Sequence, residues 1–109
     1  MAELDTQLKK GTLELCILAL VQKERKYGYD LVEQLKVLGM IITEGTLYPI
    51  LIRLRTDGYL VATWEESDQG RPRKYYEITE KGKQMLSESI KQWKEYVAIV
   101  NTIISHKHT

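Results

Sequence analysis

The stretch that decides the fold spans residues 43–78: TEGTLYPILIRLRTDG (43–58) followed by YLVATWEESDQGRPRKYYEI (59–78). Thr43 can cap a helix, and Gly58 follows where the helical pattern stops. Between them, apolar side chains recur at helical spacing, as an inward face requires: Leu47, Ile50, Leu51 and Leu54. The first part of the stretch therefore predicts a helix with one buried face.

Pro49 limits where this helix can begin. A proline is comfortable only in the first turn of a helix, so either the regular helix starts near Thr46 or its first turns are irregular. We expect the regular part over about residues 46–56.

The second part of the stretch predicts a β-hairpin. Strand-forming residues occupy 59–66 and again 73–78, where Tyr75 and Tyr76 stand side by side. The segment between them is polar and contains Gly70 and Pro72, which is typical of a turn.

Two further helices are expected before this stretch. The first covers about residues 6–22, and it is apolar on nearly all sides over 15–21, like a central helix covered by others. The second begins near Tyr27 and ends at Gly39, with apolar positions at helical spacing: Leu31, Leu35 and Leu38. Three helices followed by a hairpin are the order of a winged helix-turn-helix, a mainly helical α+β fold.

A long helix is predicted after the hairpin, capped by Thr79. Its apolar residues alternate in steps of four and three, which is a heptad seam: Leu86, Ile90, Trp93, Val97, Val100 and Ile104. About 27 residues make a rod near 40 Å long, more than a small domain can cover. We therefore expect a homodimer through this helix, and Leu4 and Leu8 are candidates for the same interface. The expected division is a DNA-binding domain over residues 1–78 and a dimerisation helix with a short tail over 79–109.

Composition places few limits on the function. The chain has 109 residues and a formal net charge of +1, so bulk charge neither demands nor excludes a nucleic-acid partner. The single cysteine, Cys16, allows no intrachain disulfide and is expected to be a small buried hydrophobe. The apolar run 13–21 is too short to cross a bilayer, and the first residues lack a signal-peptide pattern. We expect a cytoplasmic protein without a membrane partner.

An enzyme is not expected. The sequence shows no glycine-rich phosphate loop, metal-ligand cluster or nucleophile elbow, and it has no internal histidine to act as a general base. His106 and His108 have the spacing of a chelating pair, but a frayed polar tail is the better interpretation. No metal or cofactor is predicted.

The candidate DNA contacts are on the third helix and in the hairpin. Side chains expected to face outward from the helix offer hydroxyls and guanidinium groups, which suit phosphates and base edges: Thr46, Tyr48, Arg53 and Arg55. In the hairpin, Pro72 stiffens a cluster of three cations: Arg71, Arg73 and Lys74. For any one of these cations the alternative is an ordinary solvated surface charge.

Three blocks of the sequence resemble the PadR family of transcriptional regulators in order and spacing. The matching residues are Tyr27-Gly28-Tyr29-Asp30-Leu31, Thr43-Glu44-Gly45-Thr46-Leu47-Tyr48-Pro49-Ile50-Leu51, and Gly70-Arg71-Pro72-Arg73-Lys74-Tyr75-Tyr76 with Thr79-Glu80-Lys81-Gly82. The resemblance implies a dimeric winged-helix repressor of double-stranded operator DNA. It places Thr43 and the Glu44 to Tyr48 block at the start of the recognition helix, and Arg71 to Lys74 in the wing.

The short C-terminal part resembles that of the small subgroup of this family, some members of which sense aromatic drugs at the dimer interface. By position, Trp93 and Trp64 match the tryptophans that line that effector site. Ordinary interface packing explains Trp93 equally well, and aromatic residues are at home in strands such as that of Trp64. A second alternative concerns the whole protein, because a winged helix can also act as a protein-protein interaction module without specific DNA binding.

Overall fold

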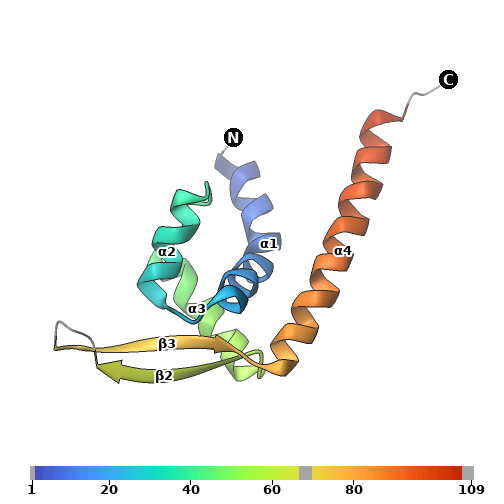
Figure 1. The fold of residues 1–109 in the computed structure, drawn as a ribbon. Helices are drawn as coiled ribbons and strands as arrows, with labels where there is room; N and C mark the ends of the chain where they lie inside the picture. The colour runs from blue at the N-terminus through green and yellow to red at the C-terminus, as the bar shows by residue number, and fades with distance from the viewer. Residues whose placement is uncertain (1, 67–69, 107–109) are drawn as a thin grey trace.

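The chain forms a winged helix with one long helix leaving it. The computed structural model describes residues 2–66 and 70–106, with side chains from residue 11 onward. In these residues the elements are α1 (Ala2–Lys23), β1 (Lys26–Tyr27), α2 (Gly28–Val37), α3 (Glu44–Thr56), β2 (Leu60–Glu66), β3 (Pro72–Ile78) and α4 (Glu80–Ser105). Figure 1 shows α1, α2 and α3 grouped together, with the β2–β3 hairpin projecting to one side and α4 to the other. The predicted mainly helical winged-helix fold is confirmed.

The sheet has three antiparallel strands in the order β1-β3-β2. Pairing in the hairpin runs from Leu60 opposite Ile78 to Glu66 opposite Pro72, as expected for the wing. The sequence analysis missed β1, which pairs with β3 through Lys26 and Tyr27. A strand of two residues is too short to show an alternating pattern.

The core lies where the three helices meet the start of the sheet. Ile17 and Leu18 of α1 are fully buried, which confirms α1 as the central helix. Of the three leucines at helical spacing, Leu31 and Leu35 are buried in the core, whereas the side chain of Leu38 is 68% exposed. α2 ends at Val37, and Gly39 turns the chain away with a φ of 107°.

α3 begins earlier than the sequence predicted. It is regular from Glu44, two residues before the expected start, and Pro49 lies inside it. The Thr43 hydroxyl accepts a hydrogen bond from the Thr46 amide at 3.2 Å, which stabilises the first turn. Pro49 has no N–H to donate to the carbonyl of Gly45, yet the helix continues through it to Thr56. The buried face is as expected, with Leu47, Leu51 and Leu54 in the core.

The first turn of α4 is tied to the turn that follows α3. The Thr79 hydroxyl accepts from the Gly82 amide at 3.0 Å and donates to the Gly58 carbonyl at 2.7 Å. The Lys81 ammonium donates to the Asp57 carbonyl at 2.8 Å. These contacts connect the end of the predicted DNA-binding helix directly to the beginning of the long helix.

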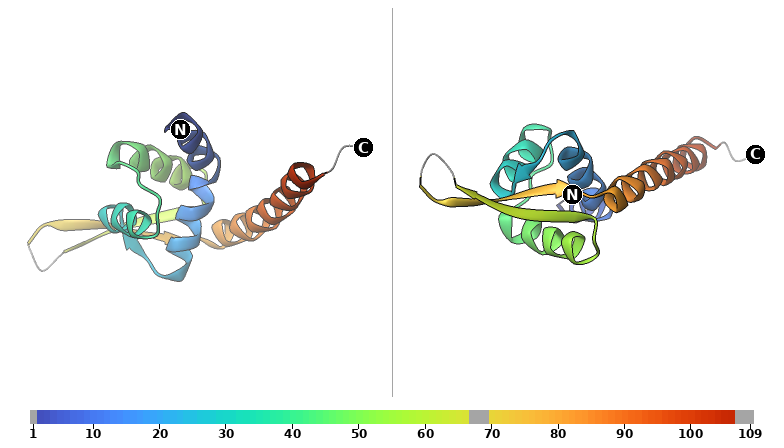
Figure 2. Two further views of the ribbon diagram at one scale, coloured as in Figure 1. Left: turned by 90° about the horizontal axis from the view of Figure 1, so that it is seen from above. Right: turned by 60° about the horizontal axis from the view of Figure 1, so that its bottom comes forward.

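Beyond this joint α4 extends away from the domain (Figure 2). Its early turns pack on α1, and Leu86 belongs to the core. The molecule is 66 Å along its longest axis but only 32 and 20 Å along the others. Among the described residues, no helix combines the length and the apolarity that crossing a membrane requires.

Candidate nucleic-acid interface

The outer side of α3 divides into a centre and two flanks. Gly45, Pro49, Ile52 and Thr56 follow one another in steps of four, three and four, so they share the face opposite the buried leucines, and all four are exposed. Tyr48 lies on the flank toward the hairpin, and Arg53 lies on the flank toward α1. The predicted contact residues Glu44, Thr46 and Arg55 are also exposed.

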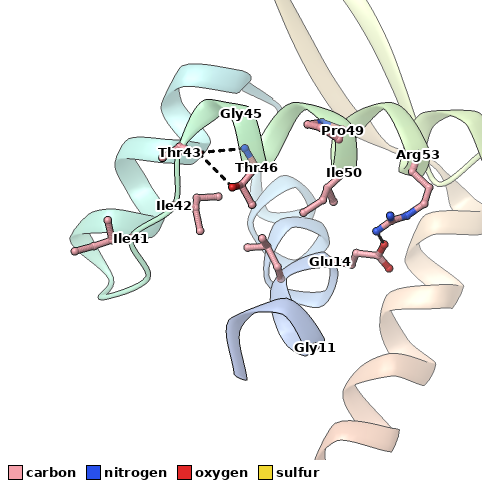
Figure 3. A pocket seen from close by; sticks show the side chains of 11 residues that line it. Gly11, Glu14, Ile41, Ile42, Thr43, Gly45, Thr46, Pro49, Ile50 and Arg53 are labelled. Carbon is pink, nitrogen blue, oxygen red and sulfur yellow. Dashed lines mark hydrogen bonds and ion pairs between the residues drawn. The ribbon is translucent and has the colours of Figure 1, made fainter. Parts of the chain in front are cut away.

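The side chain of Arg53 is paired with a carboxylate of its own chain. Its guanidinium forms an ion pair with the Glu14 carboxylate of α1 (Figure 3). The pair borders a hollow of about 700 Å³ between α1 and α3, which Thr43 and Thr46 also line. Both partners are about half exposed, so the pair is weak and water can compete for it. Arg53 can therefore exchange Glu14 for a phosphate only by breaking this contact.

The position of Tyr48 depends on Gly28, the first residue of α2. A β-carbon at position 28 would lie 2.7 Å from a ring carbon of Tyr48 and 2.8 Å from its hydroxyl oxygen. Burial, together with the negative charge of Glu44, raises the pKa of the Tyr48 phenol. The hydroxyl therefore stays protonated at neutral pH and can donate a hydrogen bond.

Two of the wing cations are stacked on aromatic rings. The Arg73 guanidinium carbon lies 4.5 Å from the centroid of the Tyr27 ring, and the Lys74 ammonium lies 5.6 Å from that of Trp64. Such contacts hold a cation in place without neutralising its charge. The third predicted cation, Arg71, is exposed beside the hairpin turn, most of which lies outside the described residues.

A third stacked cation, Arg25, lies against the middle of the hairpin, and the sequence analysis did not single it out. Arg25 lies 4.4 Å from the centroid of the Tyr75 ring and forms an ion pair with Glu65. The guanidinium lowers the pKa of the Glu65 carboxyl. Arg25 has no local sequence signal, because its partners come from strands about 40 and 50 residues later in the chain.

The wing and α3 share one surface. A hollow of about 390 Å³ lies between them, lined by Tyr48 and Ile52 from α3 and by Trp64, Arg73 and Lys74 from the hairpin. Of the predicted contact residues, the structure brings Tyr48, Arg73 and Lys74 together around this hollow, whereas Thr43, Thr46 and Arg53 line the hollow between α1 and α3. Ile52 was not among the predicted site residues, because exposed aliphatic side chains carry no recognisable motif.

The two tryptophans lie on different surfaces of the chain. Trp64 lines the hollow beside α3, whereas Trp93 stands on α4, which projects to the opposite side of the domain (Figure 1). One chain alone therefore does not bring them together.

The predicted seam on α4 is divided between the core and the surface. Leu86 is 1% exposed and packs inside its own chain, while Ile90, Val97 and Val100 are half-buried. Other large apolar side chains of α4 are uncovered in the single chain and form a broad surface: Trp93, Tyr96, Ile99, Ile103 and Ile104. Leu4 and Leu8 lie in α1, but their side chains are outside the described part of the chain.

Two other predicted features lie away from this interface. Burial raises the pKa of the Cys16 thiol, as expected for a packing residue. His106 is the C-cap that follows α4, and His108 lies outside the described residues. Across residues 2–66 and 70–106 no cluster of potential metal ligands occurs.

Comparison with known proteins identifies the family. Residues 17–88 match the model of the "Transcriptional regulator PadR-like family". The chain belongs to the PadR-like family. Members of this family are DNA-binding transcriptional regulators, which confirms the expectation that the chain is not an enzyme.

Known transcriptional regulators are similar to this chain over 75–97% of its length. The transcriptional regulator Rv3488 of Mycobacterium tuberculosis is 34% identical over 82 residues, which cover 75% of this chain and 76% of the relative. A PadR family regulator from Eggerthella lenta has 33% identity and a TM-score of 0.90, with 97% and 93% of the two chains covered. A PadR-like regulator from Bacillus cereus has 36% identity and a TM-score of 0.83, covering 93% and 99%.

Proposed function

We propose that this PadR-like protein binds operator DNA with α3 in the major groove and the wing on the adjacent backbone or minor groove. The observation that supports this most is the shared surface of α3 and the wing, where stacked cations adjoin an exposed helix face. Phosphate contacts from the wing would fix the position of α3, and groups on α3 would read the bases. The predicted contacts include Thr43, Glu44, Thr46, Tyr48, Arg53, Arg55, Arg71, Arg73 and Lys74.

Selection of bound genomic fragments tests this proposal. We expect the chain to enrich a small set of promoter fragments and to retard them in a mobility-shift assay against excess unrelated DNA. Failure to retard any fragment even at low salt would contradict the proposal and favour a protein-protein interaction module.

The same proposal includes a homodimer held by α4. Its uncovered side chains, among them Trp93, Tyr96 and Ile103, form an apolar surface that a second copy would bury. A two-fold dimer presents two recognition helices, which suits paired half-sites about 34 Å apart. In this arrangement the unit 79–109 supplies the interface and the unit 1–78 supplies the DNA contacts.

Repression and its release by an effector are the finer part of the proposal. Trp93 stands on the surface assigned to the dimer, where a planar aromatic ligand could stack between the two copies. Because α4 is joined to the end of α3 through Thr79 and Lys81, a ligand that splays the α4 helices would change the spacing of the recognition helices.

Tryptophan fluorescence tests the effector site directly. Planar aromatic cations are expected to quench the protein saturably, and Trp93→Ala should abolish that response. Trp64→Ala tests the second predicted effector residue, whose ring in one chain lies beside Lys74 in the hollow between α3 and the hairpin. Quenching that depends on Trp64 alone, or that does not saturate, would contradict an effector site at the α4 interface. A promoter reporter that falls on expression of the protein and recovers with the quenching compound would support repression.

A further inference from the structure

The centre of the outward face of α3 has almost no capacity for hydrogen bonding. Gly45 has no side chain, and the side chains of Pro49 and Ile52 carry neither donor nor acceptor. Thr56, the last residue of the helix, is the one hydroxyl on this line. The polar groups of α3 lie on the flanks, with Tyr48 beside the wing and Arg53 held by Glu14.

Ile52 is the large apolar side chain on this central line. It is 58% exposed, although it lies one residue after the fully buried Leu51. It also lines the hollow shared with the wing, beside Tyr48 and Trp64. An apolar group that packs against Ile52 would therefore have aromatic neighbours on the wing side.

The apolar group that the major groove offers is the C5-methyl of thymine. Gly45 and Pro49 add little bulk to the helix face, so this part of α3 can approach the bases closely. We infer that Ile52 is a specificity-determining residue that packs on a thymine methyl group in each half-site. α3 then reads at least one T·A pair by apolar contact, and its polar flanks contact phosphates and neighbouring bases. This inference rests on the proposed operator binding.

Replacing thymine by deoxyuridine in the operator removes only the methyl group. An operator obtained by selection with the full-length protein is resynthesised with one thymine at a time changed to uracil, symmetrically in both half-sites. Binding is measured by fluorescence anisotropy at fixed salt for the wild type, Ile52→Ala and Leu38→Ala. Leu38 is a matched control because it is an exposed leucine, the C-cap of α2, and lines neither of the two hollows beside α3.

We expect uracil at one position to weaken wild-type binding by about fourfold per half-site, the value of one buried methyl group. Leu38→Ala should show the same ratio between the two DNAs. Ile52→Ala should bind the thymine operator more weakly and show a ratio near one at that position. Unchanged unfolding curves for Ile52→Ala would show that the fold is intact.

Two outcomes would overturn the inference while operator binding stands. In one, uracil has no effect at any position on the wild type. In the other, Ile52→Ala keeps the full preference for thymine. If the wild type binds no DNA specifically, the proposed function itself fails, which the selection step reveals before any substitution is made.

Discussion

Gly28 shows how one residue of α2 can set the position of a candidate DNA contact on α3. The ring of Tyr48 occupies the space where a β-carbon of residue 28 would stand, with a ring carbon only 2.7 Å from that point. The Gly28 backbone does not require glycine, because its φ is not positive. The constraint at position 28 therefore comes from Tyr48 and not from backbone strain.

Gly28→Ala is expected to destabilise the protein by about 1–3 kcal/mol through overpacking against Tyr48. In a Tyr48→Ala background the same substitution should be neutral or slightly stabilising, since alanine suits a helix better than glycine. Urea unfolding of the two single variants and the double variant measures this coupling. Equal losses in both backgrounds would show that Tyr48 is not the constraint.

Gly82 lies where the first turn of α4 packs tightly against Tyr59, the residue before β2, and against Ile78 at the end of β3. A β-carbon there would lie 2.2 Å from the carbonyl oxygen of Tyr59, and backbone cannot move aside as a side chain can. We expect Gly82→Ala to cost about 1–3 kcal/mol or more. Gly11→Ala in α1 is the matched helical control, because among the described side chains and the backbone outside its own turns of helix nothing lies within 4 Å of the added carbon, and it should stabilise by up to about 1 kcal/mol. If thermal unfolding showed Gly82→Ala to be more stable than Gly11→Ala, the close packing of Gly82 against Tyr59 would be contradicted.

At the scale of elements, the sequence predicted each helix and both hairpin strands, because apolar periodicity and capping residues act locally. Thr79 was recognised as a cap, and its hydroxyl does accept from the Gly82 amide. The start of α3 was misplaced because Pro49 was given more weight than the cap at Thr43.

Other features of the site depend on contacts between segments far apart in the chain. The ion pair of Arg53 with Glu14 joins residues 39 positions apart. The stacking of Arg25 on Tyr75 likewise appears only when β1 pairs with β3. Periodicity does not encode such pairs, so the sequence could indicate an outward Arg53 but not its partner.

The wing is the element whose charge should be measurable in DNA binding. Arg73 is held over the Tyr27 ring, a contact that does not neutralise its charge. We expect Arg73→Ala to weaken operator binding and to reduce the slope of log K against log salt by about 0.9 for each wing that contacts a phosphate. Lys91→Ala, an exposed cation on α4, serves as the control and should leave the slope unchanged. If Arg73→Ala left the salt slope unchanged, Arg73 would not be a phosphate contact.

At the scale of the whole molecule, the uncovered part of α4 is the main argument for the dimer. Ile103 is 67% exposed, so a charge there does not disturb the core of the single chain. We expect Ile103→Asp to convert a dimer into a monomer at micromolar concentration, as measured by light scattering, with little change in the helical circular dichroism. Val37→Asp, at the 82% exposed end of α2, should remain a dimer. A wild-type protein that is monomeric under these conditions would contradict the dimer.

The contacts of Thr79 and Lys81 would relate the pairing of two α4 helices to the spacing of the operator half-sites. Because α4 is bonded to the turn after α3, pairing of two α4 helices fixes the distance between the two recognition helices. We expect that inserting about five base pairs between half-sites, half a helical turn, lowers wild-type affinity by on the order of 100-fold, because only one half-site can then be occupied. Ile103→Asp should bind both operators with the same weak affinity. If the monomeric variant still distinguished the two spacings, or the wild type did not, the two recognition helices would not be positioned through α4.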